Sequence, residues 1–156
     1  MTYVGDGNNV ARSLAIACSK TGMAFSIACP KDYHLDDDFL KQVANPTNGF
    51  EVHQTDNLEA ALQDASAVYT DVWSSMGYEA ETAKREKDFA AYQVNGKLMS
   101  LAPRDALFMH CLPAHRGVEV TDEVMDSPQS VVVQQAANRM HAQKGLMVWL
   151  AGKRAK

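Results

Sequence analysis

The chain has 156 residues, of which 46% are hydrophobic and 22% charged, the balance of an ordinary globular protein that forms one domain. Its formal net charge of −4 gives no electrostatic attraction for polyanions, so we expect no nucleic-acid partner. No apolar stretch approaches the ~20 residues of a membrane span, and we expect no membrane association either.

Short apolar runs alternate with helical patterns through the first half of the chain. The predicted elements there are a strand at 3–4, a helix at 9–21, a strand at 23–29, a helix at 36–43, an edge strand at 50–55 and a helix at 57–65. Gly22 is placed to close the first helix as a C-cap. The chain opens almost inside its first strand, which suggests that a segment is missing upstream.

The second half continues the alternation. Its predicted elements are a strand at 67–70, a charged and solvated helix at 79–91, a short helix at 95–101, a strand at 106–109, a β-branched strand at 131–133 and a closing helix at 136–150. Strands that alternate with helices predict an α/β fold: a doubly wound, Rossmann-like parallel sheet flanked by helices, in a single domain.

Four polar clusters follow predicted strands. They are Gly5–Asn9, Asp71–Gly77, His110–Arg116 and Asn138–Arg139. In open α/β sheets, ligands bind outside the carboxyl ends of the strands. Four such clusters in one short chain therefore predict a composite site for a small polar molecule.

The Gly5–Asn9 cluster lies between a strand and a helix, where free N–H groups can bind an anion. A dinucleotide site is the obvious interpretation, but Val10 occupies the third glycine position and the next strand ends in Cys29-Pro30 without a carboxylate. We therefore expect no cofactor. A plain turn with an asparagine N-cap explains this loop equally well when it is considered alone.

Asp71 and Arg139 are the charged residues of the clusters Asp71–Gly77 and Asn138–Arg139. A carboxylate at a strand end can bind an ammonium group through a charge-assisted hydrogen bond, and it can equally cap the next segment. The rigid fork of Arg139 suits a phosphate, carboxylate or carbonyl oxygen, although surface salt bridging is the simpler role for a lone arginine.

Cys111 has three possible roles: thiolate nucleophile, metal ligand or small buried hydrophobe. His110 and His115 lie close in sequence, so a Cys-His hydrolase and a zinc site both need consideration. The zinc interpretation is weak because the other cysteines, Cys18 and Cys29, are far away, and we expect no bound metal. Three widely spaced cysteines fit a reducing cytoplasm better than a disulfide framework.

Taken together, these segments resemble the carboxyl-terminal, amino-acid-binding half of ornithine carbamoyltransferases. The matching segments are Tyr3-Val4-Gly5-Asp6-Gly7-Asn8-Asn9, Thr70-Asp71-Val72-Trp73, Ser75-Met76-Gly77, His110-Cys111-Leu112-Pro113 and Asn138-Arg139-Met140-His141. The related aspartate carbamoyltransferases carry another residue where Cys111 stands and lack the Ser-Met-Gly loop. The resemblance covers nearly the whole chain.

The resemblance implies transfer of a carbamoyl group from carbamoyl phosphate to the δ-amine of L-ornithine, which yields L-citrulline and phosphate. It implies that the two ends of the amino acid are bound by Asn9, Asp71, Ser75 and Met76. It also implies that Cys111 orients ornithine without forming a covalent bond, and that the Cys111-Leu112 backbone and Arg139 bind the carbamoyl group. A neutral amine attacking a carbonyl needs such positioning and oxyanion stabilisation more than a covalent nucleophile.

Two departures from the family pattern shape our expectations. The amino-terminal, carbamoyl-phosphate-binding domain with its Ser-Thr-Arg-Thr loop has no counterpart in residues 1–156, and Ala137 stands where the family usually has glutamate. We therefore expect an ornithine-binding half that is catalytically incomplete alone. The alternative is an amino-acid-binding module or complementing subunit without its own catalysis. The apolar stripe of the closing helix further predicts self-association through residues 136–150.

Overall fold

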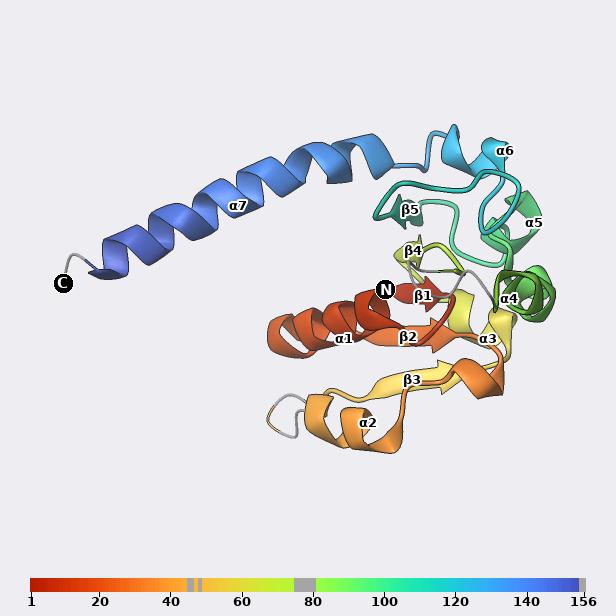
Figure 1. The fold of residues 1–156 in the computed structure, drawn as a ribbon, viewed down its shortest axis with the longest axis horizontal. Coiled ribbons are helices and arrows are strands. Elements are labelled where there is room, and N and C mark those ends of the chain that lie inside the picture. The colour runs from red at the N-terminus through yellow and green to blue at the C-terminus, as the bar shows by residue number, and fades with distance from the viewer. Residues whose placement is uncertain (45–46, 48, 75–80, 155–156) are drawn as a thin grey trace.

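One parallel sheet organises the chain in the computed structural model, which describes residues 1–44, 47, 49–74 and 81–154 (Figure 1). The strands are β1 (Thr2–Val4), β2 (Phe25–Ala28), β3 (Val52–Thr55), β4 (Ala67–Thr70) and β5 (Leu107–His110). They lie in the order β3-β2-β1-β4-β5, and every pairing is parallel. The predicted doubly wound sheet is confirmed, with β3 as an edge strand.

Helices connect the strands and cover the sheet. They are α1 (Asn9–Thr21), α2 (Asp37–Val43), α3 (Leu58–Leu62), α4 (Thr82–Phe89), α5 (Gly96–Met99), α6 (Asp122–Met125) and α7 (Val132–Arg154), with the 3-10 helices η1 (Lys31–Tyr33) and η3 (Ala90–Tyr92). The Asn8 side chain caps α1 by accepting hydrogen bonds from the backbone N–H groups of Val10 and Ala11. Gly22 closes α1 in the left-handed conformation, as the sequence predicts.

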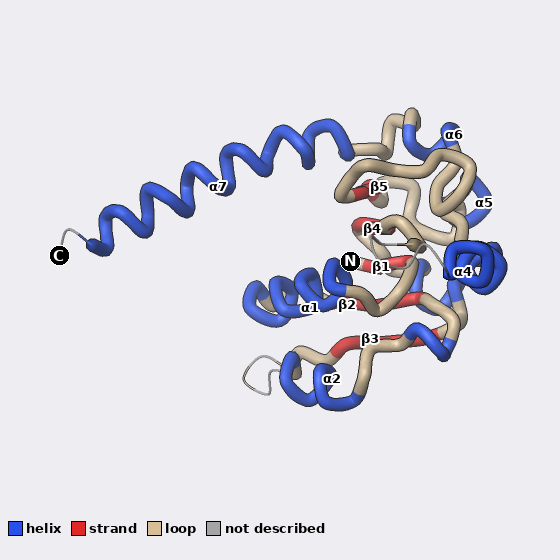
Figure 2. The backbone as a smooth tube through the Cα atoms, viewed as in Figure 1, coloured by secondary structure: helices blue, strands red, loops and turns tan. Residues whose placement is uncertain are grey.

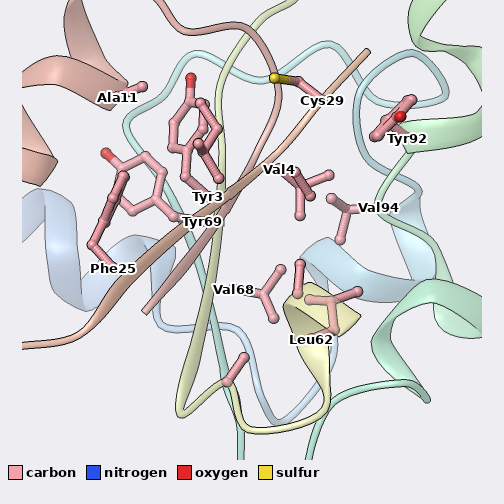
Figure 3. Packing of buried hydrophobic residues seen from close by; sticks show 14 of the residues in the cluster. Tyr3, Val4, Ala11, Phe25, Cys29, Leu62, Val68, Tyr69, Tyr92 and Val94 are labelled. Carbon is pink, nitrogen blue, oxygen red and sulfur yellow. The ribbon is translucent and has the colours of Figure 1, made fainter. Parts of the chain in front are cut away.

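The core has two halves, one on each face of the sheet. Side chains alternate between the faces along each strand, so Tyr3 and Val4 point in opposite directions. Figure 3 shows Tyr3, Tyr69 and Phe25 on the side of Ala11, and Val4 on the side of Leu62. Because both faces are covered, the three central strands β2, β1 and β4 are mostly buried, as parallel sheets require, whereas the edge strands β3 and β5 are partly exposed.

The strand order places a topological switch point between β1 and β4. The chain runs from β1 to β2 and β3 in one direction, then returns through α3 to β4 and continues to β5 on the other side. The connections that leave the carboxyl ends of β1 and β4 therefore separate at this point. Open α/β sheets bind their ligands in the crevice that results.

The last predicted strand, 131–133, is wrong. Only Ser130 forms a bridge with Phe108 of β5, and Val132 already begins α7. The β-branched run continues as helix because Val132 packs into the core there, whereas Val133 is 78% exposed. α6 is an additional short helix that the sequence pattern did not predict.

α7 extends beyond the rest of the fold (Figure 2). It spans 23 residues, longer than the predicted 136–150, and all positions from 136 to 152 are exposed. Within the part of the chain that the structure describes, no helix has both the length and the apolar character needed to cross a membrane.

Candidate ligand-binding site

Asp71 is the centre of the polar cluster at the switch point. Asp71 directly follows β4 and is buried, with 7% of its surface exposed. Oδ1 accepts hydrogen bonds from the Cys111 thiol at 2.9 Å and from the Val72 backbone N–H at 2.8 Å, while Oδ2 accepts one from Asn8 Nδ2 at 3.3 Å. Asp71 forms no ion pair with a lysine or arginine among the described residues. This carboxylate is therefore suited to a cationic group of a ligand.

Asn8 and Tyr3 fix the β1 side of this cluster. The Tyr3 hydroxyl donates to Asn8 Oδ1 at 3.3 Å, and the same oxygen caps α1. With Oδ1 serving as acceptor, the Asn8 amide nitrogen is directed toward Asp71. Burial, and then the nearby Asp71 carboxylate, raise the pKa of Tyr3 well above its usual value, so the hydroxyl keeps its proton.

Cys111 carries a neutral thiol. Burial comes first and the hydrogen bond to Asp71 second among the causes that raise its pKa to about 12. A thiol in this state donates a hydrogen bond and is a poor nucleophile at neutral pH. The arrangement therefore favours a positioning role for Cys111.

Tyr69 and Gln135 pack beside the polar cluster and contact its members. The rings of Tyr3 and Tyr69 are stacked with centroids 5.9 Å apart, and Figure 3 shows them side by side. Gln135, in the first turns of α7, donates to the Tyr69 hydroxyl at 3.1 Å and accepts from the His110 backbone N–H at 3.2 Å. Burial first, and then the proximity of Cys111, raise the pKa of Tyr69 to about 12.

The segment after β5 has an unusual backbone. The Leu112-Pro113 peptide bond is cis, and Leu112 has a φ of 56°. The Leu112 backbone N–H donates to Nδ1 of His110 at 2.9 Å. Just before this turn, Cys111 lies beside Asp71, because Thr70 at the end of β4 pairs with His110 at the end of β5.

An ion pair joins α4 to the β1–α1 loop. The guanidinium of Arg85 donates to Asp6 and, at 3.2 Å, to the backbone carbonyl of Trp73. Arg85 is 8% exposed, which corrects the prediction that this charged helix is solvated throughout. Its contacts link three segments that border the site.

The structure brings together only some of the residues implied by the family resemblance. Asp71 and Cys111 are in direct contact, and Leu112 follows immediately. Asn9 is exposed on the first turn of α1, and Arg139 is exposed on α7 without a hydrogen bond among the described residues. Ser75 and Met76 lie outside the described residues.

Several residues that contribute to the site are not predicted from the sequence. The Asn8 amide donates to Asp71 in addition to capping α1. Gln135 contacts Tyr69, and Glu119 lies beside His110. The sequence pattern predicts site residues only directly after strands. Gln135 and Glu119 lie one helix or loop away from the strand ends, so the pattern does not identify them.

The geometry does not favour the alternative chemistries. In His110, Nδ1 accepts from Leu112 and Nε2 lies 3.4 Å from Glu119, so neither ring nitrogen is directed at the Cys111 thiol. A Cys-His hydrolase needs such a base. No group of three or more His, Cys, Asp or Glu side chains in the described ranges is arranged to hold a metal ion.

Comparisons with known proteins agree with one another. Residues 1–150 match the family model described as aspartate/ornithine carbamoyltransferase, Asp/Orn binding domain. The ornithine carbamoyltransferase of Halalkalibacterium halodurans is 49% identical over 152 residues, which cover 96% of this chain and 48% of that protein. The chain thus spans about half the length of the curated relatives it matches.

Solved structures show the same relationship. The ornithine carbamoyltransferase from Pyrococcus furiosus superposes with a TM-score of 0.86 at 49% identity, covering 94% of this chain and 47% of that one. The anabolic enzyme from Campylobacter jejuni gives a TM-score of 0.90 at 34% identity, covering 97% and 51%.

Proposed function

This chain belongs to the aspartate/ornithine carbamoyltransferase family as its Asp/Orn-binding domain, and we propose that it is the L-ornithine-binding half of an ornithine carbamoyltransferase. The Asp71 carboxylate carries this proposal. It lies at the switch point, is fixed by three hydrogen bonds and has no cationic partner among the described residues. A buried anion held in this way fits the ammonium group of an amino acid.

In the proposed complex, the α-amino and carboxylate ends of ornithine are bound by Asp71 with Asn9, Ser75 and Met76. The neutral thiol of Cys111 orients the amino acid without a covalent bond, and its raised pKa supports that role. The backbone of Cys111-Leu112 and the Arg139 guanidinium are proposed to bind the carbamoyl group. Arg139 must then approach from α7, so its proposed role depends on where that helix docks.

The proposed reaction of the complete enzyme converts carbamoyl phosphate and L-ornithine to L-citrulline and phosphate, as part of arginine metabolism. We propose that residues 1–156 alone give no citrulline above background, because they contain no Ser-Thr-Arg-Thr phosphate loop. Positioning and charge stabilisation of both substrates account for most of the rate in such a transfer. Citrulline formation with and without an added carbamoyl-phosphate-binding domain tests this; turnover by the 156-residue chain alone would refute it.

We also propose a cytoplasmic location for the protein and self-association of the chain. The three free cysteines support a reducing, cytoplasmic location. The six large apolar side chains that are exposed between residues 140 and 150 of α7 support self-association through residues 136–150, since exposed apolar surface gathered on one element often marks an interaction site.

Calorimetric titration with L-ornithine tests the binding proposal. Asp71→Asn keeps the shape and removes the charge, so we expect affinity to fall by about 1.5–3 kcal/mol, the contribution of a hydrogen bond between charged groups. L-Norvaline, which lacks the δ-amine, should show the same dependence on Asp71. Asp64→Asn is the matched control, because Asp64 is exposed away from the site and should leave affinity unchanged. Equal affinity of the Asp71→Asn and natural chains would refute the role of Asp71.

A further inference from the structure

The segment of residues 110–115, here called the Cys111 loop, contains a backbone conformation that needs support. Leu112 is the one residue other than glycine with a positive φ in the described part of the chain. A side chain in the left-handed region is strained and persists only where its surroundings hold it. The strained residue lies next to Cys111, whose thiol reaches Asp71.

The His110 side chain supplies the first support. Its Nδ1 accepts the hydrogen bond from the Leu112 backbone N–H at 2.9 Å. An imidazole nitrogen that accepts a hydrogen bond carries no proton, so the proton of neutral His110 must be on Nε2. The support therefore depends on which tautomer His110 adopts.

Glu119 faces the other nitrogen of that ring. Its Oε1 lies 3.4 Å from Nε2 of His110, and both side chains are fully buried. The same Oε1 accepts the backbone N–H of His115, at the other end of the Cys111 loop. One buried carboxylate thus contacts both ends of the loop, and it favours the tautomer with the proton on Nε2.

Glu119 is itself fixed from outside the loop. Its backbone carbonyl accepts from the Val94 N–H at 2.8 Å, and the neighbouring Val120 forms a bridge with Val94. Val94 and Val120 are both completely buried. The core therefore holds the backbone of Glu119 in place, while its carboxylate lies against both ends of the loop.

We infer that Glu119 is a positioning residue, which acts through His110 to hold Leu112 in its left-handed conformation and Cys111 beside Asp71. It touches neither Cys111 nor Asp71 in the described contacts. The expected effect of Glu119 on ornithine affinity rests on the proposed function. Its effect on the conformation of the Cys111 loop does not.

The ligand-free chain provides the first test. Long-range ¹H–¹⁵N NMR identifies the protonated nitrogen of each histidine ring, and we expect the proton of His110 on Nε2 at neutral pH. The Leu112 amide should be protected from hydrogen exchange. A proton on Nδ1 of His110, or a Leu112 amide that exchanges as fast as an unprotected one, would overturn the inference.

Two substitutions separate positioning from a general loss of structure. Glu119→Ala removes both acceptor oxygens, and we expect Leu112 to lose its protection and ornithine affinity to fall about tenfold. Glu119→Gln keeps an oxygen at the Oε1 position and should preserve the tautomer and the protection, even where the alanine variant does not fold. His115→Ala is the control: it removes an imidazole 3.9 Å from Glu119 Oε2 but keeps the backbone donor, and should change neither readout.

The outcomes distinguish this inference from the proposed function. If Leu112 stays protected in folded Glu119→Ala, or if Glu119→Gln loses the protection, the positioning role of Glu119 is refuted. If the natural chain shows the expected tautomer and protection but binds no ornithine, the proposed function fails and the role of Glu119 in the loop stands.

Discussion

At the scale of single residues, the state of Cys111 determines what the site can do. A cysteine after a strand, next to histidine, has the sequence signature of a nucleophile. The structure pairs its thiol with Asp71, and burial together with this carboxylate raises its pKa to about 12. Cys111 therefore acts as a neutral hydrogen-bond donor, although its sequence context is that of a covalent nucleophile.

Alkylation kinetics can test this state. With a pKa of about 12, only about one Cys111 in ten thousand is a thiolate at pH 8, so reaction with iodoacetamide should be slow and should accelerate as pH rises. Asp71→Asn removes the neighbouring charge, which lowers the pKa and should speed the reaction at pH 8. Mass spectrometry assigns the modified cysteine.

Cys29 is the internal control for this experiment. Its pKa is also raised to about 12, but by burial and then by Asp6. Its reaction rate should be the same with and without the Asp71 substitution. Equal Cys111 rates in the two chains would show that Asp71 does not hold the thiol in its neutral form.

At the scale of elements, the orientation of α4 depends on one buried arginine. Lys84 and Arg85 are neighbours on a helix whose composition predicts a solvated surface. Lys84 pairs with Asp88 on the exposed side, whereas Arg85 turns inward to Asp6 and the Trp73 carbonyl. Helical geometry explains the difference, because adjacent residues point about 100° apart around the axis.

Arg85→Met should therefore destabilise the fold. The change leaves the Asp6 carboxylate without its partner in a mostly buried position, and we expect a loss of about 2–3 kcal/mol in the free energy of unfolding, reduced from the fully buried case because Asp6 is partly exposed. Urea unfolding measures this loss. Lys84→Met, the matched surface change, should cost much less; equal losses would contradict an anchoring role for Arg85.

At the scale of the whole molecule, α7 is the least supported part. Its first turns are held by Val132 and Gln135, but Met140, Leu146, Met147, Val148, Trp149 and Leu150 are each about half exposed or more. Residues 132–154 contain no acidic residue, although the chain as a whole is acidic. The exposed apolar side chains and the positive charge of this helix can both bind another chain.

We predict that the intact chain self-associates through α7 at high micromolar concentration. Met140 and Met147 are seven residues apart and lie on one face, so replacing both by Glu should produce monomers. Asn138→Glu lies off that face and should leave the association unchanged. Gel filtration with light scattering distinguishes these cases, and a chain ending after Gln135 should also be monomeric. A monomeric intact chain would refute the prediction.

The fold class and the family can both be predicted from local patterns in the amino-acid sequence. Alternating apolar runs predict the parallel sheet, and the polar groups after its strands predict Asp71 and Cys111 as site residues. These signals are local, because a strand end and the residue that follows it are neighbours in the chain. Ser75 and Met76 stay predictions.

Which polar groups contact one another depends on how the elements pack, and no local pattern predicts it. The contacts of Asn8 with Asp71, of Gln135 with Tyr69 and of Glu119 with His110 join residues that no helical or strand periodicity relates. The same applies to residues 131–133, where packing of Val132 overrides β-propensity, and to α7, whose apolar residues remain exposed. Local patterns determine elements, whereas the distances between elements, and with them hydrogen bonds and pKa values, arise only when the chain packs.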